Sequence, residues 1–345
     1  MAYNKIQFIA YCIYVGGKQK ERSVQQYYPG LPNIKEDIKK RCELMEKAVE
    51  LAVDSKVMVQ QDAKTLKIFV APEFYFRGPK GAYSLEQYDE VLSKLQAFSN
   101  SPDFADWLFV FGSTIAASNV DQPQKEAYNI VIVQKGNAGE SGCRIIMKEH
   151  KSAKDFLVNP ANDEGLDDRQ VNHITPAKTS GVGRERQKHN YGGEGIFEID
   201  GICYGVEICY DHMMQRLRKS AVARGEARVQ VQIVPSAGAN LEEKSVITVK
   251  DGLAFNCDGL YNTAGYHPAD IMGHSRLCIT EIACSGKTNA KLRDIKPLGF
   301  REITPKFIAD GIFFRGAGQL HFYSAQKIPQ SSIRSKWQLG ADYKV

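Results

Sequence analysis

A cysteine stands at the junction between a strand-like and a helix-like stretch of this sequence. Residues 202–208 alternate apolar side chains, as a β-strand does, and run directly into Cys209. From Asp211 onward, apolar residues recur at helical spacing. Free N–H groups at the start of a helix favour a thiolate over a thiol. The pattern therefore predicts an activated nucleophile at Cys209, with a buried core cysteine as the alternative.

Two further reactive side chains follow apolar strands in the same manner. Glu73 comes directly after residues 66–72, and Lys148 comes directly after residues 144–147. The ends of neighbouring strands meet at one edge of a sheet, where α/β proteins hold their ligands. A carboxylate can take a thiol proton and return it to a leaving amine, and an ammonium can stabilise an oxyanion. Taken singly, Glu73 could be a solvated turn residue and Lys148 a charged strand end.

The elements that must position these side chains alternate between strands and helices, which predicts an α/β fold. Asn33 with Glu36, and Ser84 with Gln87, are capping patterns at the start of two amphipathic helices. Residues 149–193 are polar and lack periodicity, so we expect a long functional or mobile loop there, with a plain surface loop as the alternative. Further elements are expected as strands at 6–15, 107–112, 128–134, 144–147, 229–235, 259–266 and 275–284, and as a helix after residues 236–238.

Composition excludes several classes of protein. The chain has 345 residues, 43% of them apolar and 25% charged, and its net charge of +5 is too small to indicate a nucleic-acid or membrane-surface partner. It contains no apolar run of about 20 residues and no signal-peptide layout, so we expect no membrane association. Its 8 cysteines are irregularly spaced, which predicts reduced thiols in the cytoplasm and no metal site.

Three short motifs occur in a fixed order along the chain. They are Ala-Pro-Glu-Phe at 71–74, Lys-Glu-His at 148–150 and Gly-Val-Glu-Ile-Cys-Tyr-Asp at 205–211. Together they resemble the nitrilase (carbon–nitrogen hydrolase) superfamily, in its amidase and carbamoylase-like branch. The resemblance extends from the first strand to about residue 284 and includes Tyr128-Asn129 and Gly273-His274-Ser275.

The resemblance implies a four-layer αββα sandwich with a Glu-Lys-Cys catalytic triad. Cys209 would attack a carbonyl or nitrile carbon, and Glu73 would act as general base and acid. Lys148 and the backbone N–H of Tyr210 would hold the oxyanion. It also implies no metal and no organic cofactor, and a small linear amide or N-carbamoyl compound as substrate.

Family members often carry a second glutamate bonded to the lysine. Glu164 is the candidate by position, with Glu149 and Glu185 as competitors. The supporting or substrate-binding residues expected beside the triad are Tyr210, Tyr128, Phe74, Tyr75 and Ser236. The chain departs from the family after Asp211, where His-Met-Met-Gln at 212–215 replaces the usual Arg-aromatic-Pro-Glu. The resemblance therefore gives no expectation for the packing of the loop behind the nucleophile, whereas the nucleophile itself is unaffected.

The resemblance also sets the expected organisation. Residues 1–284 would form the hydrolase domain with the inserted loop 149–193, and residues 285–345 a C-terminal extension at an oligomer interface. We expect a homodimer or a larger homo-oligomer. Nitrile hydrolysis and amide acyl transfer would use the same triad, and a catalytically silent binding or scaffold protein is a further alternative.

Overall fold

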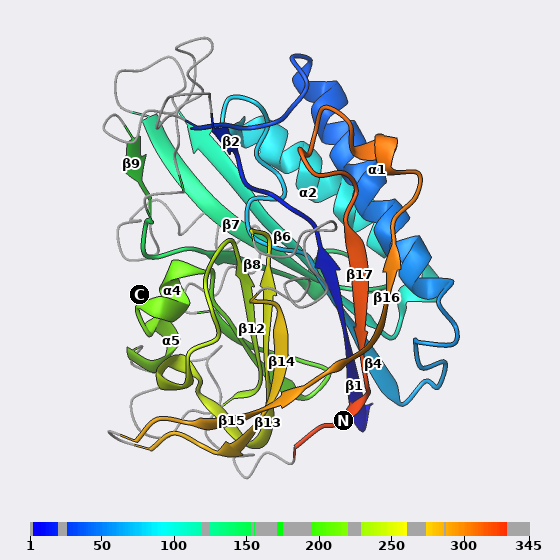
Figure 1. Ribbon diagram of the computed structural model, residues 1–345, viewed down its shortest axis with the longest axis vertical. Helices are drawn as coiled ribbons and strands as arrows, with labels where there is room; N and C mark the ends of the chain where they lie inside the picture. The colour runs from blue at the N-terminus through cyan, green and yellow to red at the C-terminus, as the bar shows by residue number, and fades with distance from the viewer. Residues whose placement is uncertain are drawn as a thin grey trace.

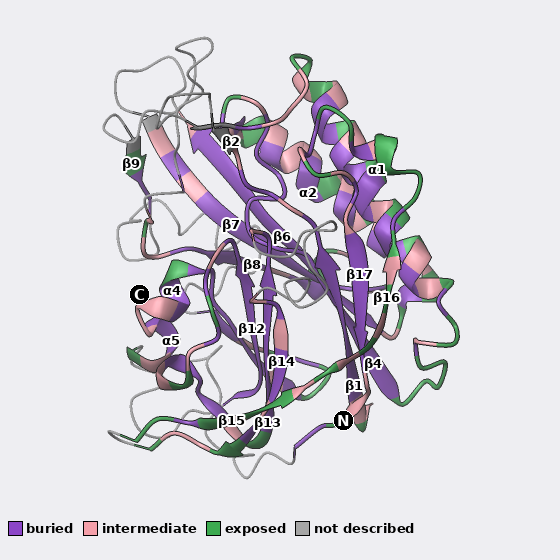
Figure 2. Ribbon diagram, in the orientation of Figure 1, coloured by how far each residue is buried: buried purple, intermediate pink, exposed green. Residues whose placement is uncertain are grey.

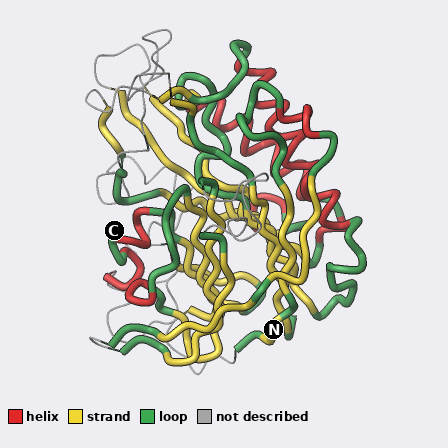
Figure 3. The backbone as a smooth tube through the Cα atoms, in the orientation of Figure 1, coloured by secondary structure: helices red, strands yellow, loops and turns green. Residues whose placement is uncertain are grey.

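Two β-sheets packed face to face form the centre of the molecule in the computed structural model, and helices lie outside both sheets (Figures 1 and 3). This arrangement confirms the expected four-layer αββα sandwich. The structure describes residues 3–19, 26–118, 125–152, 155, 171–174, 195–219, 229–260, 274–285 and 288–329.

The first sheet carries Glu73 and Lys148 at the ends of two of its strands. Its strand order is β16 (Pro297–Glu302), β17 (Gln319–Tyr323), β1 (Lys5–Cys12), β4 (Thr65–Val70), β6 (Trp107–Ser118), β7 (Lys125–Lys135) and β8 (Cys143–Met147). Three short strands join beside this path, namely β18 (Gln326–Lys327) on β1, β5 (Tyr83–Ser84) on β6 and β9 (Val171–His173) on β7. Strands β1, β4 and β6 run parallel, whereas β7 is antiparallel to both β6 and β8.

The second sheet carries Cys209. Its order is β10 (Ile196–Ile199), β11 (Ile202–Val206), β12 (Val229–Ser236), β13 (Thr248–Asp258), β14 (Arg276–Ile282) and β15 (Lys291–Ile295). Strands β11, β12 and β13 are parallel, so their carboxyl ends lie along one edge of the sheet. A separate hairpin is formed by β2 (Lys18–Gln19) and β3 (Gln26–Tyr27).

Two long helices cover the outer face of the first sheet, α1 (Ile34–Val53) and α2 (Leu85–Ser99). Both begin as the sequence predicts. The Asn33 side chain accepts a hydrogen bond from the amide of Glu36, and Ser84 and Gln87 form a reciprocal capping box. Outside the second sheet lie the short helices α4 (Tyr210–Met213) and α5 (Arg216–Lys219). None of the described helices combines the length and apolar character that crossing a membrane requires.

The main core lies between the two sheets, whose central strands are buried along most of their length, whereas β15 and β16 are largely exposed (Figure 2). Phe8 on β1 and Phe255 on β13 stack across it, with ring centroids 4.6 Å apart. A second core joins the other face of the first sheet to the long helices and includes Phe69, Phe109 and Met45. Burial on both faces explains why these strands read as continuous apolar runs.

The expected C-terminal extension is built into this sandwich over its described part. β17 pairs antiparallel with β1, β16 pairs with β17, and β15 forms the outer strand of the second sheet. The division of the chain at residue 284 stays a prediction. Whether the same segment also reaches an oligomer interface stays a prediction.

The strand expected at 259–266 lies outside the described residues except for residues 259–260, and the strand before it is β13, Thr248–Asp258. One expected element was wrong. The helix predicted after residues 236–238 is an extended segment followed by a short 3₁₀ helix, Glu243–Ser245. This expectation failed because the described chain crosses from β12 to β13 without a long helix. Of the expected loop 149–193, the structure describes residues 149–152, 155 and 171–174, and residues 171–173 form β9.

Candidate active site

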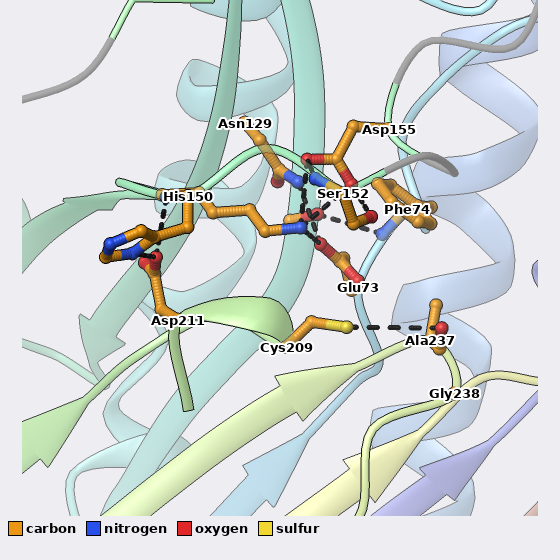
Figure 4. A network of polar contacts seen from close by, with 12 residues as sticks. Glu73, Phe74, Asn129, His150, Ser152, Asp155, Cys209, Asp211, Ala237 and Gly238 are labelled. Carbon is orange, nitrogen blue, oxygen red and sulfur yellow. Dashed lines mark hydrogen bonds and ion pairs between the residues drawn. The ribbon is translucent and has the colours of Figure 1, made fainter. Parts of the chain in front are cut away.

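Cys209 occupies a sharp turn between β11 and α4. Its backbone has φ 46° and ψ −102°, a left-handed conformation that L-residues rarely adopt. The turn is held because the Cys209 amide donates to the carbonyl of Pro235, at 3.0 Å, and Asp211 donates to Ile208. The sulfur lies 4.0 Å from the carbonyl oxygen of Ala237, in the loop after β12 (Figure 4). The predicted strand-to-helix junction is confirmed.

The thiolate predicted from sequence is not the resting state that this environment favours. Burial raises the pKa of the Cys209 thiol well above its ordinary value, and the negative charge of Glu73 raises it further, whereas Lys148 lowers it. The helix after the cysteine has only 4 residues, so its dipole is small. The sulfur therefore rests as a neutral thiol and needs a base to become a nucleophile.

Glu73 is placed beside that thiol by the loop after β4. This loop is fastened to β6, because the Ser113 amide donates to the carbonyl of Pro72 and the Phe74 amide donates to Oγ of Ser113. Gly112 adopts φ +77°, and a Cβ atom there would lie 2.4 Å from the carbonyl oxygen of Pro72. A glycine is thus required for the close approach of this loop to β6.

The two oxygens of the Glu73 carboxylate have different surroundings. Oε1 accepts hydrogen bonds from Nζ of Lys148 and Nδ2 of Asn129, both at 2.8 Å. Oε2 has no hydrogen-bond partner among the described residues, while the carboxylate interacts with the Cys209 thiol. Figure 4 shows the carboxylate on the side of the cluster that faces the sulfur. Burial raises the pKa of Glu73, and the attraction of Lys148 only partly opposes that shift.

Lys148 joins the two carboxylates of the cluster. Its Nζ lies 2.8 Å from Oε1 of Glu73 and 2.8 and 2.9 Å from the two oxygens of Asp155, and all three side chains are fully buried. Burial alone would lower the pKa of Lys148, but the two carboxylates outweigh that effect and raise it. The lysine is therefore a permanent cation at this site.

Asp155 is the site residue that the sequence analysis missed. Its carboxylate also accepts hydrogen bonds from the amide and the hydroxyl of Ser152, the latter at 2.7 Å. Among the described residues, the second carboxylate on Lys148 is thus an aspartate. Of the glutamates expected in this role, Glu164 and Glu185 lie outside the described residues, and Glu149 uses its backbone amide to contact Asp211. The spacing Ser-x-x-Asp after Lys148 was the signal that could have revealed Asp155.

Asn129, and not the expected Tyr128, contacts the active-site cluster. Its side chain bonds Glu73, and its backbone carbonyl accepts the amide of Lys148 at 2.8 Å. Neighbouring residues on a strand point to opposite faces, so Tyr128 turns away, packs toward the helices and donates to Glu126. Tyr75 is also turned away from the cluster: it is buried in the helix-facing core, and its hydroxyl donates to the carbonyl of Arg41.

The other expected supporting residues lie around the cluster. The ring of Phe74 has its centroid 5.8 Å from Nζ of Lys148. The amide of Tyr210 donates no hydrogen bond to another described residue, and its ring is 38% exposed. Ser236 is buried at the end of β12, where its hydroxyl donates to Ala239 at 3.4 Å and so braces the loop that contains Ala237. Phe74 therefore lies beside Lys148, and Tyr210 directly follows Cys209 in the chain. Ser236 supports the loop that Cys209 faces.

Two buried networks hold the segment after Cys209. The Asp211 carboxylate accepts the amides of Glu149 and His150, which ties this turn to the chain just after Lys148. His212 donates from Nδ1 to Glu207 at 2.7 Å, and its Nε2 accepts the amide of Glu242 at 2.9 Å. The His-Met-Met-Gln segment thus uses His212 to fasten the loop.

No group of three His, Cys, Asp or Glu side chains in the described part of the chain is arranged to hold a metal ion. Its cysteines are all free thiols. The described cluster contains a buried thiol, two carboxylates and a lysine cation.

Comparison with known proteins gave matches among solved structures. No protein-family model and no curated protein sequence matches the chain. The fold is similar to Nit3 of Saccharomyces cerevisiae, a member of branch 10 of the nitrilase superfamily, with 14% identity and a TM-score of 0.46 over 94% of this chain and 90% of that chain. It is also similar to an amidase from Nesterenkonia sp., with 12% identity and a TM-score of 0.42 over 95% of this chain and 91% of that one. Likenesses at this level of identity do not assign an activity.

Proposed function

We propose that this chain is a cysteine-dependent hydrolase of the nitrilase superfamily that cleaves non-peptide C–N bonds in a linear amide or N-carbamoyl substrate. One observation carries the proposal. Glu73 is held through Oε1 by Lys148 and Asn129, while the carboxylate interacts with the Cys209 thiol. A carboxylate fixed at one oxygen and open at the other is suited to accept a proton from a buried neutral thiol.

The first half-reaction follows from this placement. The thiol proton of Cys209 moves to Glu73 as the sulfur attacks the substrate carbonyl carbon. The resulting oxyanion lies near the Lys148 ammonium and the amide of Tyr210. Glu73 then returns the proton to the leaving nitrogen, the C–N bond breaks, and an amine or ammonia departs from a thioester on Cys209.

The second half-reaction reverses the same proton path. Glu73 takes a proton from water, whose oxygen attacks the thioester carbon. The thioester bond breaks and the carboxylic acid leaves, and the proton held by Glu73 returns to the sulfur. Glu73 thus has the same charge at the start and the end of each cycle.

The proposal is tested by intact-protein mass spectrometry after brief treatment with iodoacetamide. We expect rapid addition of one acetamide group to the wild type and its loss in Cys209→Ala. Cys203→Ala is the matched control, because Cys203 is a partly exposed thiol outside the cluster, and it should label as the wild type does. Labelling that is slow and unchanged in Cys209→Ala would indicate an inert thiol and favour the scaffold alternative.

The substrate class is tested by ammonia release from a panel of short primary amides, including butyramide, and of N-carbamoyl amino acids. Hydrolysis and acyl transfer share the thioester, so hydroxylamine distinguishes them. A hydroxamate product would show that the acyl-enzyme reacts with amines, and its absence would count against transfer. Aliphatic nitriles in the same panel test the nitrilase alternative.

The remaining expectations belong to this proposal. We propose a homodimer or larger assembly in the cytoplasm that binds neither nucleic acid nor membranes. A monomer in light scattering at micromolar concentration would contradict the assembly.

A further inference from the structure

A second buried cation, Arg77, lies beside the active-site cluster. The Arg77 side chain is only 2% exposed. Its Nε donates to the carbonyl of Gly81 at 3.2 Å, and its Nη2 donates to the backbone carbonyl of Asp155. Arg77 therefore joins the loop after Glu73 to the segment after Lys148, two parts of the chain that are far apart in sequence.

Two aromatic rings enclose the guanidinium group. Its central carbon lies 3.7 Å from the centroid of the Tyr28 ring and 4.3 Å from that of Phe74. Nζ of Lys148 lies 5.8 Å from the centroid of the same Phe74 ring. Cations are attracted to aromatic faces, and more strongly where water is excluded. Phe74 is thus in contact with both cations of the site.

The charges of the cluster balance only when Arg77 is counted. Glu73, Asp155 and Lys148 together leave one negative charge in a fully buried place, since the Cys209 thiol is neutral. A buried charge without a counter-charge is costly. Arg77 interacts electrostatically with both carboxylates and brings the sum to zero.

The other charged groups that face Arg77 do not change this sum. On α1, Arg41 is paired with Asp37 at 2.9 Å, and Tyr83 on β5 donates its hydroxyl to Asp37. Tyr28, before α1, is a neutral phenol against the guanidinium. Within the described residues, Arg77 is therefore the cation that offsets the excess carboxylate.

We propose that Arg77 is a positioning residue of this active site: it supplies the second positive charge of the buried cluster and holds Asp155 and Phe74 against Lys148. This inference rests on the proposed function. Without the charge of Arg77, the ionised form of Glu73 would lose an attractive partner, and the repulsion from Asp155 would be less fully offset. Glu73 would then hold a proton to higher pH, and in that state it accepts none from Cys209.

The test measures the rate of Cys209 alkylation by iodoacetamide as a function of pH. For Arg77→Gln we expect the acidic midpoint to move upward by about 1 pH unit, and the rate below that midpoint to fall about tenfold. For Arg77→Lys, which retains the charge, we expect the wild-type midpoint with a lower rate. Arg301→Gln is the control, since Arg301 bonds Ser55 away from the cluster and should change nothing.

The outcomes separate this inference from the function on which it rests. A folded Arg77→Gln protein with the wild-type midpoint and rate would overturn the role of Arg77. Absence of Cys209 alkylation in the wild type would overturn the proposed function instead. Should Arg77→Gln fail to fold, Arg77→Lys decides, because an upward shift of its midpoint by about 1 pH unit would show that the charge is not what Arg77 supplies.

Discussion

The ammonium nitrogen of Lys148 lies 2.8 Å from Oε1 of Glu73, and neither side chain is exposed to solvent. The lysine comes from the end of β8 and the glutamate from the loop after β4, so the sheet itself sets their distance. Because this ion pair fixes one carboxylate oxygen, the other remains available for Cys209. The pair therefore orients the base as well as stabilising it.

Replacing the base should remove most of the chemistry while preserving the cluster. Glu73→Gln keeps an amide oxygen for Lys148 and Asn129 but cannot accept the thiol proton. General-base catalysis contributes about 10²- to 10⁴-fold, so we expect a loss of that order in both alkylation and amide hydrolysis. Glu50→Gln, on the exposed side of α1, is the matched control and should retain full rates. Equal rates in Glu73→Gln and the wild type would exclude Glu73 as the base.

The activity should fall on the acidic side at a pH set by Glu73. Burial raises the pKa of this carboxyl above its ordinary value of 4.5. Below the raised pKa the Glu73 carboxyl is protonated and accepts no proton. Above it the carboxylate can accept the proton of the Cys209 thiol. We therefore expect the rate of Cys209 alkylation to decline with a midpoint above pH 4.5. A rate that follows only an ordinary thiol titration near pH 8.5 would contradict this assignment.

Asp155 should contribute more to the free energy of unfolding than the glutamates that the sequence offered as the second carboxylate on Lys148. Asp155→Asn removes a fully buried charge that bonds Lys148 through both oxygens. Breaking a buried ion pair costs about 3–5 kcal/mol, so we expect a loss of that size in the free energy of unfolding, with reduced activity. Urea denaturation measures the loss.

Glu149→Gln is the control for that measurement, and we expect its effect to stay within about 0.5 kcal/mol. Glu164→Gln belongs in the same series, because Glu164 was expected in this role from sequence. A larger loss in the free energy of unfolding for Glu164→Gln than for Asp155→Asn would support Glu164 as the second carboxylate on Lys148.

The backbone of Cys209 should make glycine a more stable replacement than alanine. At φ 46° and ψ −102° a side chain is strained, and glycine is not. We expect Cys209→Gly to exceed Cys209→Ala by about 1 kcal/mol in the free energy of unfolding, although both are inactive. Urea denaturation of the two variants measures the difference. A more stable alanine variant would show that the turn relaxes at little cost.

His212 should be essential for the packing behind the nucleophile. His212→Phe would leave the Glu207 carboxylate without its imidazole partner and the Glu242 amide without an acceptor. Each unsatisfied buried group costs about 1–3 kcal/mol, so we expect a loss of about 2–4 kcal/mol in the free energy of unfolding. His150→Phe is the control: His150 is partly exposed, and Asp211 keeps its backbone donors. Equal losses in the two variants would refute this role.

The sequence by itself determined which reactive side chains follow strands. Glu73, Lys148 and Cys209 each stand directly after or shortly after an apolar run, and the structure brings all three together. That inference worked because alternation and apolar runs are local properties. The strand ends that carry Glu73 and Lys148 belong to one sheet, whereas Cys209 reaches them from the second sheet, which packs against the first. The capped starts of α1 and α2 were predictable for the same reason.

Tertiary structure alone decided which groups surround those three. Asn129 comes from the middle of β7 and Arg77 from a loop, without a local pattern that places them at the site. The Ser-x-x-Asp spacing marks Asp155 but does not show that it contacts Lys148. The protonation state of Cys209 was also decided there, since burial and the charge of Glu73 outweigh the effect of a short helix. Contacts between distant segments, and the solvent that these contacts exclude, are properties of the folded chain and not of any stretch of its sequence.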